Sequence, residues 1–550
     1  MKKTFKTMLA LMAGTLAFAA CQKEDLLKND AQLHSELKEM TFTAIQEGQD
    51  EETKATIDGN KIKWASGDKI SVFDGGAADD AGHIDREFVL SDGAGTTAGK
   101  FSGSAADGAA TYYALYPYMP STIEERVPTK AEAEKAAGNK ASNLDYWRVM
   151  LEYSSVEDLK NDELSGISEP NQTIIIAYLM NTKLPFPNGV QQDGDKFSNV
   201  IIPYEQVATV GSADPKAMLM MAKSTDASTL QFKNVCAYVK VTPKFDCIAI
   251  CLRSKGTENL VGTVTVDYNN GEPSTTVNAN GSNEVLLTGT ITADNTYYIA
   301  VRPEALSSGF TISFAITDVI YNKSTTNALN LTRSNVINLG SFDKSNLISI
   351  PVTGKANAEI GGSDVEVKWI QLWENGPKFA EYNVGVTDGK AESYGGYYAW
   401  GGSQDKVDDH NTTNTGSGNL SGNDDTATKL WGSKWRMPTA DELGEKDAND
   451  NYIDGLLGKC DVEWTTVNNV KGCKFTGRGA YVSNSLFLPA AGNRSSFTGN
   501  VAYQSSLGRY WSSTPSTYNG GDQLFISESQ SVMVGITRET CSSVRAVLAE

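Results

Sequence analysis

Residues 431–438 read WGSKWRMP. Three further short strings follow before the C-terminus. They are LFLPAAG at 486–492, YWSS at 510–513 and SVR at 543–545. None of the strings is a catalytic motif, a phosphate-binding loop or a dinucleotide fingerprint. Because large aromatic side chains bury most of their area, we expect Trp435, Trp511 and Phe487 to lie in a core.

These four strings resemble the Fibrobacter succinogenes major paralogous domain, a family related to the C-type lectin-like fold and to formylglycine-generating enzymes. The resemblance covers roughly residues 365–550. It implies a compact, loop-rich α+β domain with short strands, two helices and a variable ligand-facing surface. It does not by itself imply a reaction, because function depends on the site and not on the fold.

Length and composition narrow the class of protein. The chain has 550 residues and a formal charge of −19, so it is long enough for about three or four domains and lacks the basic surface that nucleic acids require. Its 50 glycines and 22 tyrosines, with Thr and Asn between short apolar runs, favour a β-rich extracellular protein. Only His34, His83 and His410 occur, widely spaced, which argues against a histidine-based zinc site.

The N-terminus has the pattern of a signal peptide. Three lysines precede an apolar run at 8–20 that is short for a membrane span. The run ends LAFAAC at 16–21, which resembles the lipobox of bacterial lipoproteins and implies lipidation of Cys21. Cleavage near an A-x-A site, with Cys21 left as a thiol, is the alternative. The following QKED at 22–25 resembles an export signal to the outer face of the cell; a charged linker is the alternative.

The N-terminal half alternates short apolar runs with turn residues, as β-hairpins do. It contains four strings in order: WASGDKISVF at 64–73, YYALYP at 112–117, IPYEQ at 202–206 and FKNVCA at 232–237. In series they resemble the fimbrillin-like proteins of Gram-negative anaerobes. The resemblance implies two tandem transthyretin-like β-sandwich domains, so we expect a mainly β chain that ends in an α+β C-type lectin-like domain.

The sequence predicts the following domain boundaries. Residues 1–20 are a signal peptide and 21–39 a tether; 40–228 form the first sandwich, with an insertion at about 119–200; 229–352 form the second; 353–364 are a linker; 365–550 form the head. Helices are expected in the insertion near 131–140, 144–153 and 156–164, and a separate helical domain there is the alternative. Strands of the second sandwich are expected at 237–241, 260–266, 285–287, 297–301, 310–316 and 329–331.

Seven cysteines occur, and six remain if Cys21 is lipidated. The spacing of Cys460 and Cys473 suits a hairpin disulfide in an oxidising location, although connectivity cannot be deduced from sequence. Cys247 and Cys251 could pair or be buried hydrophobes. Formylglycine-generating enzymes use a pair of cysteines, and no second cysteine accompanies Cys541 in a suitable C-terminal position, so we expect a packed or free thiol and no enzyme.

Metal and cofactor motifs are weak. C-type lectins bind calcium and sugar through Glu-Pro-Asn or Gln-Pro-Asp loops, and residues 365–550 contain neither string. Glu169-Pro170-Asn171 lies in the insertion and is expected to be a turn. In 447–452, which reads DANDNY, a tyrosine stands where a calcium loop needs glycine, so we expect a solvated loop. We expect no metal and no cofactor.

Residues 493–518 mix aromatic side chains with directional hydrogen-bonding groups, a combination suited to wet carbohydrate or protein sites. In the lectin-like family the equivalent loops form the ligand face. The resemblance therefore implies a set of candidate ligand-binding residues: Asn493, Arg494, Tyr503, Gln504, Arg509, Tyr510 and Tyr518.

The sequence thus predicts a lipid-anchored, surface-exposed protein of the outer membrane and fimbrium. Its predicted function is that of a pilus tip or accessory subunit, with a lectin-like head that mediates adhesion. The expected partners are other fimbrial subunits, a host or bacterial surface glycan or protein, and the outer membrane. The alternative is a glycan-binding lipoprotein of a polysaccharide-uptake system, and an enzyme comes third.

Overall fold

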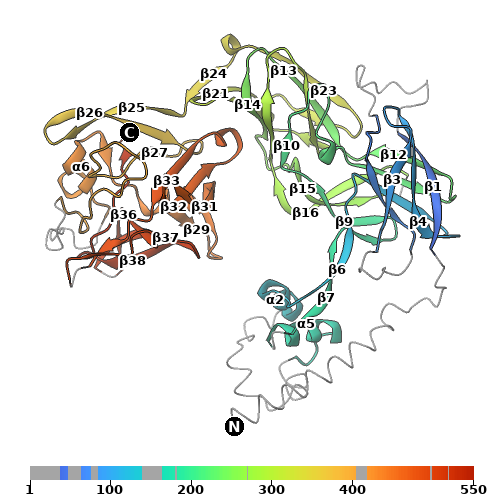
Figure 1. Cartoon of the computed structure of the whole chain (residues 1–550), viewed down its shortest axis with the longest axis horizontal. Coiled ribbons are helices and arrows are strands. Elements are labelled where there is room, and N and C mark those ends of the chain that lie inside the picture. The colour runs from blue at the N-terminus through green and yellow to red at the C-terminus, as the bar shows by residue number, and fades with distance from the viewer. Residues whose placement is uncertain are drawn as a thin grey trace, which may run out of the picture. The chain divides into compact units, whose positions relative to one another are not determined.

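The computed structural model describes residues 37–46, 63–75, 84–138, 164–179, 182–268, 271–403, 418–495, 498–517 and 519–549. The chain is mainly β, as predicted (Figure 1). The signal peptide, Cys21 and most of the tether lie outside the described residues, and within them no helix is both long and apolar enough to cross a membrane.

The chain forms two compact units that interleave along the sequence. The first comprises residues up to 202 with 218–236 and 263–280, and the second comprises 203–217, 237–262 and 281–550. A single boundary between residues 228 and 229, as predicted, therefore does not separate the two units. Each unit takes strands from both sides of it, because strands distant in sequence complete each other's sheets.

In the first unit, seven strands pair in a closed order, β1-β12-β11-β5-β2-β3-β4. The two edges of the expected sandwich are thus joined into a barrel. Trp64 is buried at its centre, with ring contacts to Phe101, Tyr116 and Phe232. The strands are β1 (Leu37–Gln46), β2 (Lys69–Phe73), β3 (Arg86–Asp92), β4 (Ala98–Ala106), β5 (Tyr112–Tyr116), β11 (Met220–Ser224) and β12 (Thr229–Asn234).

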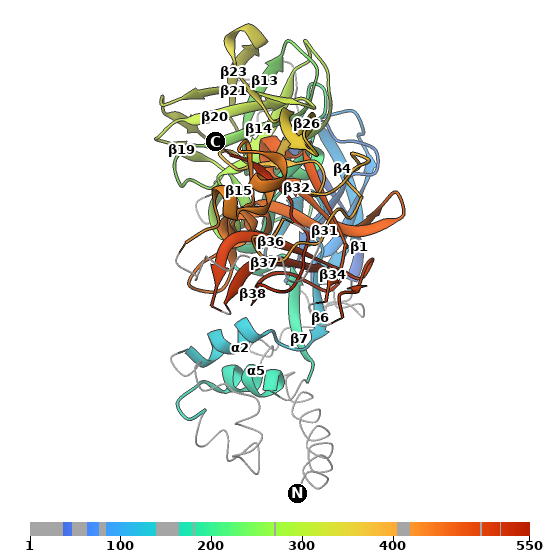
Figure 2. The ribbon, with the colours of Figure 1, turned by 90° about the vertical axis from the view of Figure 1, so that its left-hand side faces the viewer.

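The insertion begins and ends as an antiparallel ribbon of β6 (Ser121–Arg126) and β7 (Leu184–Gly189). Beyond it, α2 (Lys130–Ala137) and α5 (Glu169–Leu179) lie side by side (Figures 1 and 2). The helix expected near 131–140 is confirmed as α2, whereas those expected at 144–153 and 156–164 lie outside the described residues or at their edge. The turn expected at Glu169-Pro170-Asn171 is wrong, since it forms the first turn of α5, where proline is tolerated.

Two hairpins from either side of the predicted boundary share a four-stranded sheet, in the order β16-β15-β9-β8. Its strands are β8 (Gln191–Asp193), β9 (Lys196–Ile202), β15 (Val261–Asp267) and β16 (Ser274–Ser282).

The second unit contains a six-stranded sheet, β10-β17-β14-β20-β21-β24, and a three-stranded sheet, β18-β13-β23. Strands form at all six stretches expected for the second sandwich, with boundaries shifted by a few residues, but the one expected at 260–266 is β15 of the four-stranded sheet and lies mostly in the first unit. Cys247 and Cys251 lie on one strand, β14, and both are free and buried. The elements are β10 (Glu205–Val207), β13 (Ala237–Pro243), β14 (Cys247–Ser254), β17 (Glu284–Ile291), β18 (Tyr297–Val301), β19 (Glu304–Leu306), β20 (Phe310–Ala315), β21 (Val319–Thr325), β22 (Leu329–Leu331), β23 (Val336–Phe342), β24 (Ile348–Pro351), η3 (Pro215–Ala217) and η4 (Lys344–Asn346).

Residues 353–364 are not a linker. They form β25 (Thr353–Ile360) and the start of β26 (Ser363–Gln371), which pair antiparallel over their whole length. Gly361 and Gly362, both with positive φ, form the two-residue turn between them. Polar residues and glycine in 353–364 suggest a linker, but a Gly-Gly pair between alternating runs is also a hairpin signal.

The C-terminal region, from β25 onward, surrounds the five-stranded sheet β25-β26-β27-β39-β28 with small sheets and short helices. Its remaining elements are β27 (Lys378–Ala380), β28 (Trp435–Arg436), β29 (Glu445–Lys446), β30 (Tyr452–Asp454), β31 (Cys460–Val467), β32 (Val470–Gly477), β33 (Ser485–Pro489), β34 (Asn493–Arg494), β35 (Val501–Ala502), β36 (Leu507–Ser516), β37 (Gly520–Ser527), β38 (Ser531–Thr537), β39 (Val547–Leu548), η5 (Gly422–Asp424), α6 (Thr426–Trp431), α7 (Ala440–Gly444), α8 (Gly455–Lys459) and η6 (Gly479–Tyr481).

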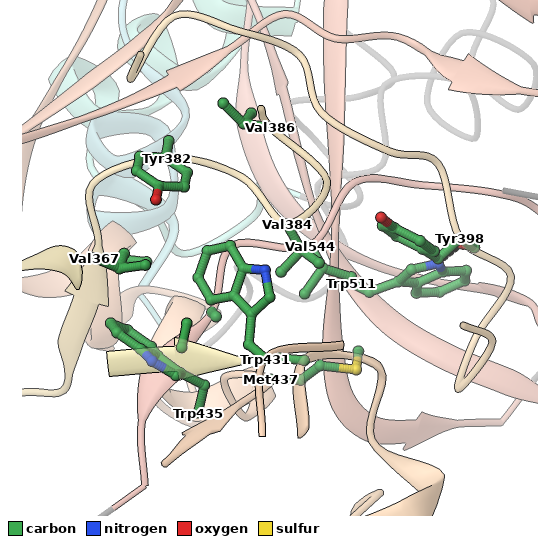
Figure 3. Packing of buried hydrophobic residues seen from close by; sticks show 14 of the residues in the cluster. Val367, Tyr382, Val384, Val386, Tyr398, Trp431, Trp435, Met437, Trp511 and Val544 are labelled. Atoms are coloured by element: carbon green, nitrogen blue, oxygen red, sulfur yellow. Dashed lines mark hydrogen bonds between the residues drawn. The ribbon is translucent and has the colours of Figure 1, made fainter. Parts of the chain in front are cut away.

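The aromatic strings form the core of this region, as expected. Trp435 and Trp511 are fully buried and Phe487 is 8% exposed. Figure 3 shows the two tryptophans in one cluster with Trp431, whose ring meets that of Trp435 edge to face at 5.4 Å. The strings WGSKWRMP and YWSS therefore bring together segments that lie far apart in the sequence.

Candidate ligand-binding site

The loops after β33 depend on Gly492, the last residue of the LFLPAAG string. Its φ is +71°, and a Cβ there would lie 2.0 Å from the carbonyl oxygen of Ala502. The close approach lets the Gly492 N–H donate to Leu507 O at 2.7 Å, which closes the β34–β35 hairpin against the start of β36. The string thus sets the position of the following loops.

Tyr503 lies at the turn between β35 and β36 and is 64% exposed. Its φ of +64° is uncommon for a bulky residue, and Ser505 also has positive φ. The carbonyl of Tyr503 accepts from the N–H groups of Ser506 and Leu507, both at 3.1 Å, so the turn is fixed by the backbone. The turn therefore presents an aromatic side chain to solvent at a conformational cost, a pattern that accumulates at functional sites.

Polar side chains of the same loops gather around Tyr397. The Gln504 side-chain amide donates to the Tyr397 hydroxyl at 2.8 Å, and that hydroxyl donates to Ala491 O at 2.7 Å. The guanidinium of Arg494 lies 5.8 Å from the Tyr397 ring and donates to Gly499 O at 2.7 Å. These contacts hold the side chains that border the turn.

Arg509 and Asn493 are half-buried at the margin of the same surface. The Arg509 guanidinium lies 5.1 Å from the centre of the Phe525 ring, and burial lowers its pKa from the ordinary value. We call Asn493, Arg494, Tyr503, Gln504 and Arg509 the loop face. It combines an exposed ring with amides and guanidinium groups, which suits stacking and directional hydrogen bonds.

Two other candidate residues do not join the loop face. Tyr510 is fully buried, and its hydroxyl donates to Pro489 O at 2.6 Å, so its assignment as a ligand contact is wrong. Burial raises its pKa. β36 is buried on both faces at this point: Tyr510 packs with Leu488 and Leu524, and Trp511, on the opposite face, packs with Trp431. Tyr518 lies outside the described residues.

Sequence reasoning missed three residues beside the loop face: Tyr394, Tyr397 and Ser505. The Tyr394 and Ser505 hydroxyls lie 3.0 Å apart, and Tyr397 connects Gln504 to Arg494 as described above. A signal was present in the YGGYYAW string at 394–400, where glycines and aromatic residues are dense. Its place beside 493–506 is a long-range contact that no local pattern reveals.

The expected disulfide between Cys460 and Cys473 is absent, and both are free, buried thiols. The β31–β32 register explains this. Cys460 lies opposite Gly477, and Cys473 lies opposite Trp464, four residues along the strand from Cys460. A disulfide needs Cα atoms within about 7 Å, whereas four strand residues span about 13 Å. Both thiols pack in a hydrophobic cluster instead.

The remaining chemical candidates have structural roles. Cys541 is fully buried in a cluster with Tyr397 and Ala491, where substrate cannot reach its sulfur. The Asp447 carboxylate accepts from the backbone N–H groups of Asn449 and Asn451, at 2.8 and 3.0 Å, and so caps the turn between β29 and β30. The described residues contain no group of three or more His, Cys, Asp or Glu side chains placed to hold a metal ion.

No family model matches this chain, and no curated protein matches it significantly. Solved structures resemble it at low identity. A proposed cell adhesion protein from Bacteroides ovatus is 11% identical, with a TM-score of 0.28, over 62% of this chain and 99% of its own. One from Bacteroides uniformis is 13% identical, with a TM-score of 0.28, over 56% and 96%. A fimbrial protein from Bacteroides ovatus is 12% identical, with a TM-score of 0.20, over 93% and 98%.

Proposed function

We propose that this chain is a lipid-anchored subunit of a cell-surface fimbrium, at its tip or as an accessory subunit, and that its C-terminal region mediates adhesion through the loop face. The exposed ring of Tyr503, held in an uncommon backbone conformation, is the observation that carries the adhesive role. The ligand is a glycan or a protein of a host or bacterial surface.

The connection between the second unit's sheet and the C-terminal region supports the tip position. The resemblance to fimbrillins implies shaft assembly by strand addition, in which a strand of one subunit completes the sheet of another. Here β24 pairs with β21 at the edge of the six-stranded sheet and runs directly into β25. For this chain to donate β24 to another subunit, β24 would have to leave the sheet. Its C-terminal end is joined to the folded C-terminal region, which favours a subunit that caps the end of the fimbrium.

The loop face gives a direct test. We expect Tyr503→Ala to weaken ligand binding about tenfold or more, because exposed aromatic anchors dominate binding energies. Stability should change by less than about 0.5 kcal/mol, since the side chain is mainly exposed. Binding of the purified protein to an array of glycans and surface proteins measures the first effect, and thermal unfolding measures the second.

Ile453→Ala is the matched control, because Ile453 is a 48% exposed apolar residue of the same region, on β30. It should leave binding unchanged. Equal binding by the wild type and Tyr503→Ala would refute the adhesive role of the loop face.

A glycan-capture lipoprotein of a polysaccharide-uptake system is the second candidate function. The same mixture of ring, amide and guanidinium on the loop face favours a sugar ligand. The location of the protein separates the two proposals. A fimbrial subunit is recovered with sheared, purified pili, whereas a capture lipoprotein stays with the outer membrane and binds a nutrient glycan.

Lipid anchoring is tested at Cys21. We expect Cys21→Ser to move the protein out of the outer-membrane fraction, because the lipid requires the thiol and a serine cannot carry it. Fractionation and metabolic labelling with a fatty-acid analogue measure the change. Asn29→Ser is the control and should fractionate as wild type. A Cys21→Ser protein that still floats with outer membrane would rule out this anchor.

A further inference from the structure

A cleft of about 370 Å³ lies within the second unit, and none of the loop-face residues lines it. One wall comes from the six-stranded sheet and includes Arg253 on β14, Glu284 on β17 and Asn322 on β21. The other comes from the C-terminal region and includes Trp373 and η6. This volume is at the lower end for small-molecule sites, so it suits a ligand of about one or two sugar rings.

The two walls are held together by direct contacts. The Arg253 guanidinium pairs with Glu374, across the cleft, and with Glu284 at 3.3 Å. The Gly479 N–H donates to the Tyr204 hydroxyl at 3.0 Å. Tyr481 is buried in a cluster with Ala249, Cys251 and Leu286 of the sheet. The cleft is therefore a preformed site, which lowers the cost of ordering on binding.

The charges that line the cleft already have partners. Arg478 donates to Asp461 at 2.8 Å and to two backbone carbonyls, and Lys459 lies 3.8 Å from Asp454. With Arg253 bound to Glu284 and Glu374, the lining leaves little excess charge of either sign. An ionic ligand would have to break one of these pairs, so the lining favours a neutral ligand.

Two groups remain for such a ligand. Asn322 Oδ1 is buried and has no hydrogen-bond partner among the described residues, a state that costs about 1–3 kcal/mol. Trp373 is half-buried. Its ring is tilted relative to that of Phe379, and the two ring centres lie 6.2 Å apart. A ring of this kind stacks on the apolar face of a sugar, and an amide bonds to its hydroxyl groups.

We propose that this cleft binds a neutral, hydroxyl-rich ligand of about one or two sugar rings, with Trp373 as the stacking surface and the Asn322 amide as a hydrogen-bonding group. The site is independent of the loop face, so the protein has two separate binding surfaces. The proposal does not require the fimbrial function to be correct.

The experiment measures binding of neutral sugars to the full chain as cells produce it. Saturation-transfer NMR with glucose, galactose, mannose, N-acetylglucosamine, lactose and maltose identifies binders, and titration gives the affinity. Glucuronate is the charged comparison and should bind more weakly than glucose. We expect Asn322→Ala and Trp373→Ala each to weaken the best sugar about tenfold.

Two controls separate this site from the rest of the protein. Asn330→Ala changes an exposed asparagine on β22 and should bind as wild type. Tyr503→Ala alters the loop face and should also leave this binding unchanged. If Trp373→Ala fails to fold, the sugar affinity of Asn322→Ala, which removes no core packing, tests the proposal by itself.

Three results would overturn the proposal. They are the absence of binding by every sugar tested, undiminished binding by Asn322→Ala, and loss of binding in Tyr503→Ala, which would assign the sugar to the loop face. Preference for glucuronate would show that the charge argument is wrong. A failure here leaves the adhesive role of the loop face standing, because that role depends on the effect of Tyr503→Ala on its own ligand, whereas this site depends on Asn322→Ala and Trp373→Ala.

Discussion

Arg545→Leu is expected to destabilise the C-terminal region by about 4 kcal/mol, because it removes the donors of a buried polar network. Arg545 is 1% exposed, and its guanidinium donates to the Asn383 amide oxygen and to the carbonyls of Ala380, Glu381 and Phe487 at 2.9 to 3.2 Å. Leucine fills part of the volume but removes all four of these hydrogen bonds. Burial lowers the pKa of Arg545 to about 10, so it is charged at neutral pH.

Urea unfolding followed by circular dichroism measures this effect. Arg478→Leu is the matched control, since the Arg478 side chain is half-exposed and makes its bonds to Asp461 and to two backbone carbonyls in contact with solvent. It should cost less than about 1 kcal/mol. If both variants unfold at the same urea concentration, Arg545 does not organise the core.

Trp511→Ala is expected to cost about 3–5 kcal/mol, the range for removing a large aromatic side chain from a packed core. Trp511 is fully buried among Trp400, Trp431 and Trp435, and its indole N–H donates to Tyr398 O at 2.8 Å. Alanine leaves a cavity and removes this hydrogen bond, although Tyr398 O keeps its bond from the Ser542 N–H at 2.9 Å. The same unfolding measurement gives the loss.

Two variants test the reasoning about Trp511. Trp511→Phe keeps most of the packing and loses the hydrogen bond, so it should cost clearly less than alanine. Trp464→Ala removes a half-buried tryptophan from β31 and should also cost less. A Trp511→Ala protein as stable as wild type would contradict its role in the core.

The fold was predictable where local pattern and burial agree. Short apolar runs between turn residues predicted the strands of the second sandwich, including β15, and the aromatic strings indicated that Trp435 and Trp511 lie in a core. The pattern failed where pairing is long-range. Residues 263–280 join the first unit because β15 and β9 are neighbours, and nothing near β15 in the sequence specifies that neighbour.

The loop face was predictable in part for the same reason. The composition of residues 493–518 predicts a ligand-binding surface, and Tyr503 in this segment is exposed. The assignment of Tyr510 is wrong because composition cannot show that β36 is buried on both faces there, where Tyr510 and Trp511 are both fully buried. The spacing of Cys460 and Cys473 suggested a hairpin, which is present, but the register of that hairpin keeps the sulfurs apart.

The junction at Val352 has a mechanical consequence. Val352 is fully buried, its N–H donates to Asp318 O at 3.0 Å, its carbonyl accepts from Gln371 N at 2.8 Å, and the next residue, Thr353, bonds to the Asp318 carboxylate. A slack linker of 12 residues would extend by about 40 Å before it carried tension. This junction has no such slack, so a tensile load on the C-terminal region passes directly into the strands of the six-stranded sheet.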